Sequence, residues 1–156
     1  MEQAEPLLEI TTKLLDINAL NLNARYYSLE AAEKMVELFN NHTTKIGEFY
    51  GSIGYAEKFT LNLKEISHKT KNVWIDYEDN SLWGTISILN NEKGKLLSEM
   101  IKSGEVVFRA RSKGSVNLDK SVEIKELISF DAIPQEEDAF GNIPFSFTKM
   151  KGNGNR

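Results

Sequence analysis

The stretch WGTISILNNEKGKLLSEMIKSGEVVFRARSKGSV, residues 83–116, is the part of the sequence that best indicates the fold. Residues 83–88 combine aromatic and β-branched side chains with small ones, which predicts a strand. Residues 93–103 predict a short amphipathic helix, which Gly104 ends. Residues 106–116 predict a second strand, and it carries two arginines and a serine, Arg109, Arg111 and Ser112.

The segments on either side extend this unit into a complete fold. Upstream, the sequence predicts a strand in the first half of residues 7–20 and a helix that Ser28 caps and residues 40–42 end. Strands at residues 59–63 and 73–75 follow, and a polar turn at 78–81 leads back to Trp83. Downstream, residues 122–133 predict a last strand. The order β-α-β-β-β-α-β-β predicts an α+β fold, a small mixed and mainly antiparallel β-barrel with two or more packed helices.

Composition narrows the class of protein. The chain has 156 residues, of which 40% are hydrophobic and 27% charged, as expected for one soluble domain. Its net charge of -4 argues against a broad nucleic-acid surface, and its lack of cysteine removes thiolate metal sites. No apolar run approaches the ~20 residues that span a bilayer, and the acidic start does not resemble a signal peptide. We expect an intracellular protein without membrane, specific nucleic-acid, metal or cofactor binding.

Several short motifs occur in an order that resembles one known family. They are NLNARYY at residues 21–27, GEF at 47–49, ISH at 66–68, ILN at 88–90 and ISFD at 128–131. Together with the strand–helix–strand unit, they resemble the prohead proteases of tailed phages, head-maturation enzymes related to herpesvirus assemblins. The resemblance covers roughly residues 21–140. It implies a prohead-protease-like domain over residues 1–140 and a C-terminal arm over residues 141–156.

The resemblance implies a serine endopeptidase, but the chain departs from the family at both reacting positions. Where the family has a Gly-Val-Ser-Ser-Arg-Gly type motif, residues 107–112 are VFRARS, so the nucleophile position holds Arg109. The family's histidine, in Gly-Glu-Leu-Asp-His-Pro, falls on Gly51 of the sequence GEFYGS at residues 47–52. A serine needs a hydrogen-bonded base to attack a carbonyl. We therefore expect a degenerate protease without catalytic residues at these positions.

A second nucleophile–base pair stays open. Ser112 is the serine nearest to the lost position, and His68 is one of only 2 histidines in the chain. In this alternative, Asp131 or Glu48 orients the imidazole of His68. In the simpler interpretation, Ser112 is a solvated serine near the end of its strand and His68 is a strand histidine without a catalytic role.

The two arginines are candidate binding residues. Arg109 and Arg111 are two positions apart, so strand alternation places their side chains on one face. They are either a rigid pair that recognises carboxylates or an acidic tail of a partner, or surface residues paired to a neighbouring strand at positions such as Glu123 or Glu126. The sequence leaves both possibilities open.

The C-terminal arm and the residue just before it carry four large apolar residues, Phe140, Ile143, Phe145 and Phe147. Their spacing is partly by two, which is typical of a strand that adds to the sheet of another subunit. Alternatively, they cover an open end of the same domain. Nearby, residues 136–138 hold three carboxylates, which we expect to form a solvated acidic turn rather than a metal site.

These inferences lead to three functional hypotheses. The first is a phage prohead or capsid assembly protein that is catalytically inactive and binds major capsid, portal or scaffold proteins, or further copies of itself. The second is an active serine endopeptidase that cleaves scaffold and capsid proteins during head maturation. The third is a small binding domain whose resemblance is accidental. For the first two, the expected location is the host cytoplasm, in the prohead or virion.

Overall fold

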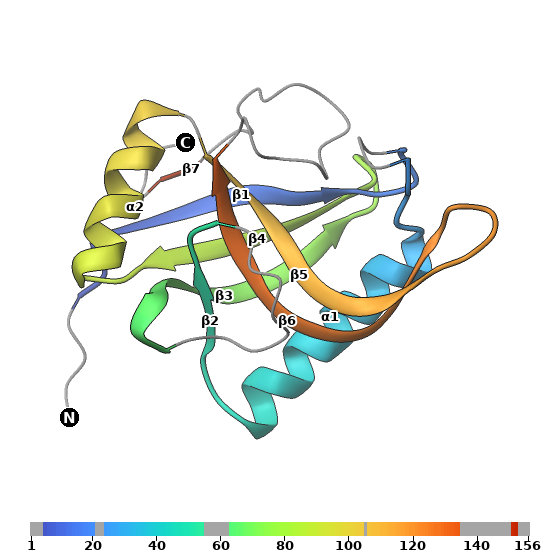
Figure 1. The fold of residues 1–156 in the computed structure, drawn as a ribbon, viewed down its shortest axis with the longest axis horizontal. Coiled ribbons are helices and arrows are strands. Elements are labelled where there is room, and N and C mark those ends of the chain that lie inside the picture. Colours follow the sequence, from blue (N-terminus) through green and yellow to red (C-terminus); the bar gives the residue numbers. More distant parts are fainter. Residues whose placement is uncertain (1–4, 21–23, 55–62, 105, 135–150, 153–156) are drawn as a thin grey trace.

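The computed structural model describes residues 5–20, 24–54, 63–104, 106–134 and 151–152. Its elements, drawn in Figure 1, are β1 (Leu8–Asp16), α1 (Leu29–Lys45), β2 (Phe49–Ser52), a short 3-10 helix η1 (Leu63–Glu65), β3 (Ile66–Asp76), β4 (Ser81–Ile88), α2 (Glu92–Ser103), β5 (Val106–Val116), β6 (Val122–Pro134) and β7 (Lys151–Gly152). From β1 to β6, the strands and α-helices follow the predicted order. Of the predicted strand at residues 59–63, only Leu63 is described, and it begins η1.

The strands form two antiparallel sheets that meet at one edge. The larger sheet has the order β2-β3-β4-β1-β7, and β5 pairs with β6 in a two-stranded sheet. The sheets are joined by an isolated parallel bridge between Ile53 and Ala132, where the Gly54 N–H donates to the Ala132 carbonyl over 2.6 Å. The predicted α+β, mainly antiparallel fold with packed helices is confirmed. The predicted barrel is wrong in one respect, because the described part of the chain does not form a closed barrel. Its two sheets are joined by a single bridge rather than by a continuous ladder of hydrogen bonds.

The first helix begins where the sequence predicts, and the second begins one residue before the predicted start at residue 93. Ser28 caps α1 and accepts the N–H of Ala31 over 3.1 Å, and Asn91 caps α2 by accepting the N–H of Gly94 over 2.7 Å. Gly104 ends α2 in the left-handed conformation with φ of 75°. The first helix runs to Lys45 rather than ending at residues 40–42. Its last turn is mostly exposed, and it is held by the Thr43 hydroxyl, which donates to the Phe39 carbonyl, and by the His42 ring, which packs edge-on against Phe49.

The core lies between the two sheets and the helices. Its largest buried side chains include four phenylalanines, Phe39, Phe49, Phe108 and Phe130. The ring centroids of Phe39 and Phe49 are 5.1 Å apart, and those of Phe49 and Phe130 are 5.9 Å apart. These contacts attach α1 to β2 and β2 to β6, so they fix the place where the two sheets meet.

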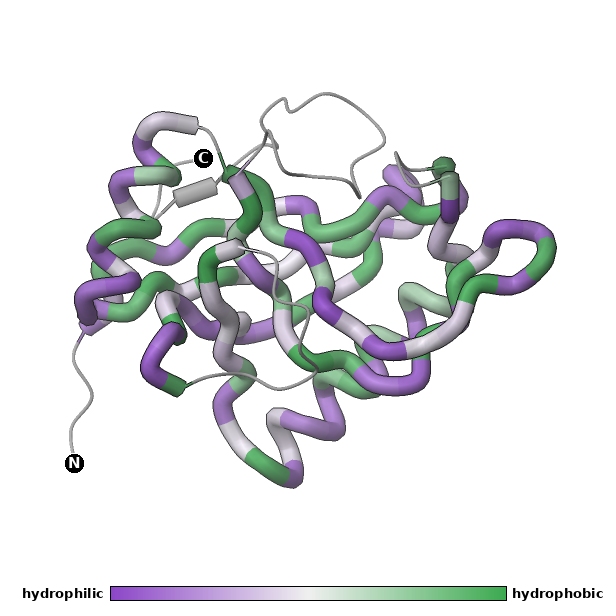
Figure 2. The backbone as a smooth tube through the Cα atoms, viewed as in Figure 1, coloured by the Kyte–Doolittle hydropathy of each residue, from purple (hydrophilic) through white to green (hydrophobic). Residues whose placement is uncertain are grey.

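The surface is mostly polar outside this core. Figure 2 shows hydrophilic segments along the exposed side of α1 and on the β5–β6 hairpin, whose turn projects from the rest of the fold. Among the described residues, neither helix has the length and apolarity needed to cross a membrane. The candidate binding phenylalanines, Phe140, Phe145 and Phe147, and the acidic residues 136–138 lie outside the described residues.

Candidate functional site

The candidate site lies where β2, β3, β5 and β6 come together. Gly51 of β2 faces His68 of β3 in the strand pairing, and Arg109 of β5 faces Asp131 of β6. A Cβ atom built on Gly51 would overlap with the Phe130 carbonyl oxygen, one residue before Asp131. The two positions that match the family's histidine and serine, Gly51 and Arg109, therefore belong to the same junction.

The side chain of His68 fills the space beside Gly51. His68 is completely buried, and its ring packs edge-on against Phe108 with centroids 5.2 Å apart. Its Nε2 lies 2.6 Å from the Phe130 carbonyl oxygen, and its Nδ1 lies 2.7 Å from the Ser67 hydroxyl. A carbonyl only accepts hydrogen bonds, so Nε2 carries the proton and a neutral ring accepts the Ser67 hydroxyl at Nδ1. Both nitrogens are thereby engaged inside the core.

This environment keeps the imidazole neutral. Burial lowers the pKa of His68 from 6.5 to about 4, against the opposing effects of the Phe130 carbonyl and the Asp131 charge. The fold thus prefers the uncharged ring, and the unfolded chain takes up a proton at higher pH than the folded one. The stability that this preference gives is complete above pH 6.5 and is lost as the pH falls towards 4.

We expect the free energy of unfolding to decrease by about 2 kcal/mol between pH 7 and pH 5 through His68 alone. The measurement is urea unfolding of the natural chain and of His68→Gln at both pH values. Gln retains an N–H donor for the Phe130 carbonyl but does not titrate, so the decrease should be about 2 kcal/mol smaller in the variant. An equal decrease in both proteins would show that His68 is not held neutral.

Asp131 forms the second half of the junction, a buried ion pair with Arg111. Arg111 Nε lies 2.8 Å from Asp131 Oδ2, and the side chains are 9% and 3% exposed. The other carboxylate oxygen, Oδ1, accepts the Ser129 hydroxyl over 2.8 Å and the Ser52 backbone N–H over 3.1 Å. This network ties β2 to both strands of the hairpin and satisfies the buried charge.

Arg109 and Arg111 lie on one face of β5, as predicted, but the expected acidic partners are wrong. Arg109 is half-buried, and its Nη1 donates to the Phe108 carbonyl over 3.0 Å. The residues that face Arg109 and Arg111 on β6 are Asp131 and Ser129, whereas Glu126 faces Lys113 and Glu123 faces Ser115.

The alternative pair of Ser112 and His68 is not hydrogen bonded in this structure. Ser112 faces Leu127 on β6, next to a register shift, whereas the nitrogens of His68 contact Ser67 and Phe130. The acidic residues proposed to orient the ring serve other groups: Glu48 pairs with Lys69 over 2.9 Å, and Asp131 pairs with Arg111. An active arrangement would require the junction to open.

Three serines at the junction, Ser52, Ser67 and Ser129, were not among the predicted site residues. A signal for Ser129 was present, because ISFD at residues 128–131 places it two positions from Asp131 on the same strand face. Ser52 and Ser67 had no such signal. In the described ranges, no three His, Cys, Asp or Glu side chains are grouped so that they could hold a metal ion.

Comparisons with known proteins support the fold but not an activity. The sequence matches no protein-family model and no curated protein. Among solved structures, the capsid assembly protease gp21 of bacteriophage T4 is similar, with a TM-score of 0.63 and 15% sequence identity over 85% of this chain and 91% of that chain. At this identity the likeness shows the fold alone, and it agrees with the prohead-protease-like fold that the motifs predict.

Proposed function

We propose that this chain is a phage prohead or capsid assembly protein that has kept a protease fold, lacks protease activity and acts by binding head proteins. The fold shared with the T4 capsid assembly protease supports this setting. The observation that carries the inactive assignment is the packing at Gly51. The position that matches the family's histidine has no room for a side chain, because the Phe130 carbonyl and the His68 ring occupy the space.

The chemistry of the neighbouring groups supports the same conclusion. Arg109, at the position of the family's serine, is permanently protonated and offers only hydrogen-bond donors, so it cannot attack a carbonyl. Asp131 is engaged by Arg111, Ser129 and the backbone of Ser52. The junction is therefore organised as a bonded and buried structural unit rather than as a nucleophile with a base beside it.

Binding would then use surfaces around this junction and the C-terminal arm. In the proposal, the half-buried Arg109 contacts acidic groups of a partner, Arg111 adds its positive charge from the buried ion pair beside it, and Phe140, Phe145 and Phe147 add apolar contacts. The partners proposed are the major capsid, portal or scaffold proteins, with further copies of this chain as an additional possibility.

The alternative function is an active serine endopeptidase with Ser112 as nucleophile and His68 as base. Burial holds the pKa of His68 at about 4, so the ring is neutral at pH 7 and can accept a proton, but it is a weaker base than an ordinary histidine. The alternative requires His68 to leave the Phe130 carbonyl, and Ser112 to approach it. The third hypothesis, an accidental resemblance, does not account for a likeness that covers 85% of the chain.

The test is intact mass spectrometry of the cognate head proteins after co-expression with this chain, Ser112→Ala or the control Ser115→Ala. We expect full-length head proteins in all samples and co-purification of at least one of them with the chain. Truncated products that disappear in Ser112→Ala but persist in Ser115→Ala would establish the protease instead. Full-length head proteins that never co-purify would contradict the assembly role.

A further inference from the structure

The turn that joins β5 to β6, residues 117–121, projects from the rest of the fold (Figure 1) and carries an exposed leucine. Leu118 has an exposed fraction of 103%, the highest of the large hydrophobic residues in the described part of the chain. Val116, two positions earlier, is 42% exposed. A single exposed apolar side chain is common on protein surfaces, so exposure alone does not indicate a contact. The further indication comes from the structure of the turn.

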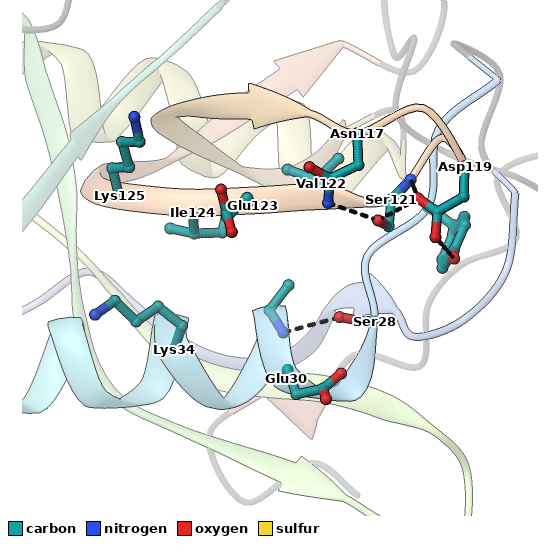
Figure 3. Close-up of a pocket in the computed structure, with 12 residues that line it drawn as sticks. Ser28, Glu30, Lys34, Asn117, Asp119, Ser121, Val122, Glu123, Ile124 and Lys125 are labelled. Atoms are coloured by element: carbon teal, nitrogen blue, oxygen red, sulfur yellow. Dashed lines mark hydrogen bonds between the residues drawn. The ribbon is translucent and has the colours of Figure 1, made fainter.

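The turn is closed on itself by hydrogen bonds between its first and last residues. The Asn117 N–H donates to the Ser121 carbonyl over 2.8 Å, and the Asn117 side-chain amide donates to the Ser121 hydroxyl over 2.9 Å. Asp119 Oδ1 accepts both the N–H of Ser121, over 3.0 Å, and its hydroxyl, over 2.6 Å. Figure 3 shows these three polar side chains gathered at the end of the hairpin, where they also line a pocket beside α1.

A second set of hydrogen bonds fixes the turn to the segment that leads into α1. Tyr26 donates its N–H to the Lys120 carbonyl over 3.0 Å, and its own carbonyl accepts the Val122 N–H over 2.9 Å. The Tyr26 hydroxyl also donates to Asp119, over 3.3 Å. Lys120 has a φ of 76°, a left-handed conformation that is unfavourable for a residue with a Cβ atom. Its N–H and carbonyl are both bonded, to Asn117 and to Tyr26, so the turn is held in this conformation.

A fixed turn with an apolar side chain at its end is suited to binding. Because the backbone is already ordered, contact with a partner costs little conformational entropy, and burial of the leucine side chain is favourable. The convex shape indicates the kind of surface that fits. A flat surface would contact only the end of Leu118, whereas an apolar pocket would surround it and leave the polar residues of the turn at the rim.

We propose that Leu118 anchors this chain to a head protein, by insertion of the turn at residues 117–121 into an apolar pocket on the surface of that protein. The inference rests on the proposed function for the class of partner. It adds a contact that is separate from the two arginines, because the turn lies at the closed end of the β5–β6 hairpin and the pair of Arg109 and Asp131 lies near its open end.

The first experiment measures the affinity of the head protein that co-purifies with the natural chain, by biolayer interferometry on the full chain and its variants. Leu118→Ala should weaken binding about tenfold, and Leu118→Asp, which would place a charge in the apolar pocket, about a hundredfold. The matched control is Leu63→Asp, because Leu63 is 71% exposed on η1, and it should leave the affinity unchanged. The urea midpoints of both Leu118 variants should equal that of the natural chain, since this side chain is fully exposed.

A second pair of variants tests whether the fixed turn contributes. Ser121→Ala removes the hydroxyl that bonds to Asn117 and Asp119 but leaves Leu118 in place. We expect it to weaken binding about threefold, because a looser turn loses more conformational freedom in the complex. Ser115→Ala, at an exposed serine of the same hairpin, is the control and should bind like the natural chain.

Crosslinking identifies the surface that the turn contacts. With p-benzoylphenylalanine in place of Leu118, irradiation of the complex should link the turn to residues that line an apolar pocket of the head protein, which peptide mass spectrometry locates. An unchanged affinity of Leu118→Asp, or crosslinks confined to a polar flat surface, would overturn the inference and leave the assembly role intact. If no head protein co-purifies with the natural chain, the assembly role and the inference both fail.

Discussion

Replacement of Arg111 by methionine is expected to lower the free energy of unfolding by about 3–5 kcal/mol. The methionine fills a similar volume but leaves the Asp131 carboxylate, 3% exposed, without its positive partner. The remaining donors, the Ser129 hydroxyl and the Ser52 N–H, stabilise one oxygen only. A loss of this size is a large part of the total stability of a small domain.

The control is Lys113→Met, two residues further along the same strand. Lys113 and Glu126 are 3.9 Å apart with side chains 52% and 62% exposed, so the loss of this pair should cost less than about 1 kcal/mol. Urea unfolding followed by circular dichroism at pH 7 measures both variants. Similar losses in the two proteins would mean that the ion pair of Arg111 and Asp131 does not differ from a surface pair.

Replacement of Gly51 by alanine is expected to cost about 3 kcal/mol, at the upper end of the usual range for overpacking. The added methyl group would overlap with the Phe130 carbonyl and the His68 ring, and the carbonyl belongs to the backbone of a paired strand, which cannot rotate away. The measurement is the urea midpoint, with Ser52→Ala as the control on the same strand. That control adds no atoms and keeps the Ser52 N–H bond to Asp131, so it should lose at most about 1 kcal/mol.

A double variant separates the two contacts of the added methyl group. Gly51→Ala combined with His68→Ala removes the overlap with the ring but not the overlap with the Phe130 carbonyl. We expect the double variant to be no more stable than Gly51→Ala. Recovery of stability would show that the ring alone excludes a side chain at residue 51.

The sequence predicted the local elements well because their signals are local. The predicted cap Ser28 and the predicted helix end Gly104 depend on neighbours within a few positions. The end of α1 was placed too early, since hydrogen bonds of Thr43 and Ile46 to preceding carbonyls and the contact of His42 with Phe49 continue the helix by one turn. The predicted closure of the barrel was also wrong. Closure depends on hydrogen bonding between two sheets, which the pattern of a single strand does not indicate.

The candidate site was only partly predictable, for a reason that the β5–β6 hairpin makes clear. Counted back from the pair of Val116 and Val122, a regular ladder would place Leu127 opposite Arg111. Register shifts at two places along the hairpin move Ser129 to that position instead. These shifts bring Arg111 close enough to Asp131 to form the ion pair. No pattern in the sequence predicts the shifts. Likewise, the burial of His68 depends on a glycine on the next strand.

The packing of His68 on β3 against Gly51 on β2 has an evolutionary consequence. If the chain descends from an active protease, a single mutation that returns histidine to position 51 meets the ring of His68 and the backbone of β6 before it meets any substrate. Reversion would first require a smaller residue at position 68 and a shifted strand, neither of which brings an advantage alone. Loss of catalysis in this lineage would then be held in place by packing, long after any selection against the activity had ended.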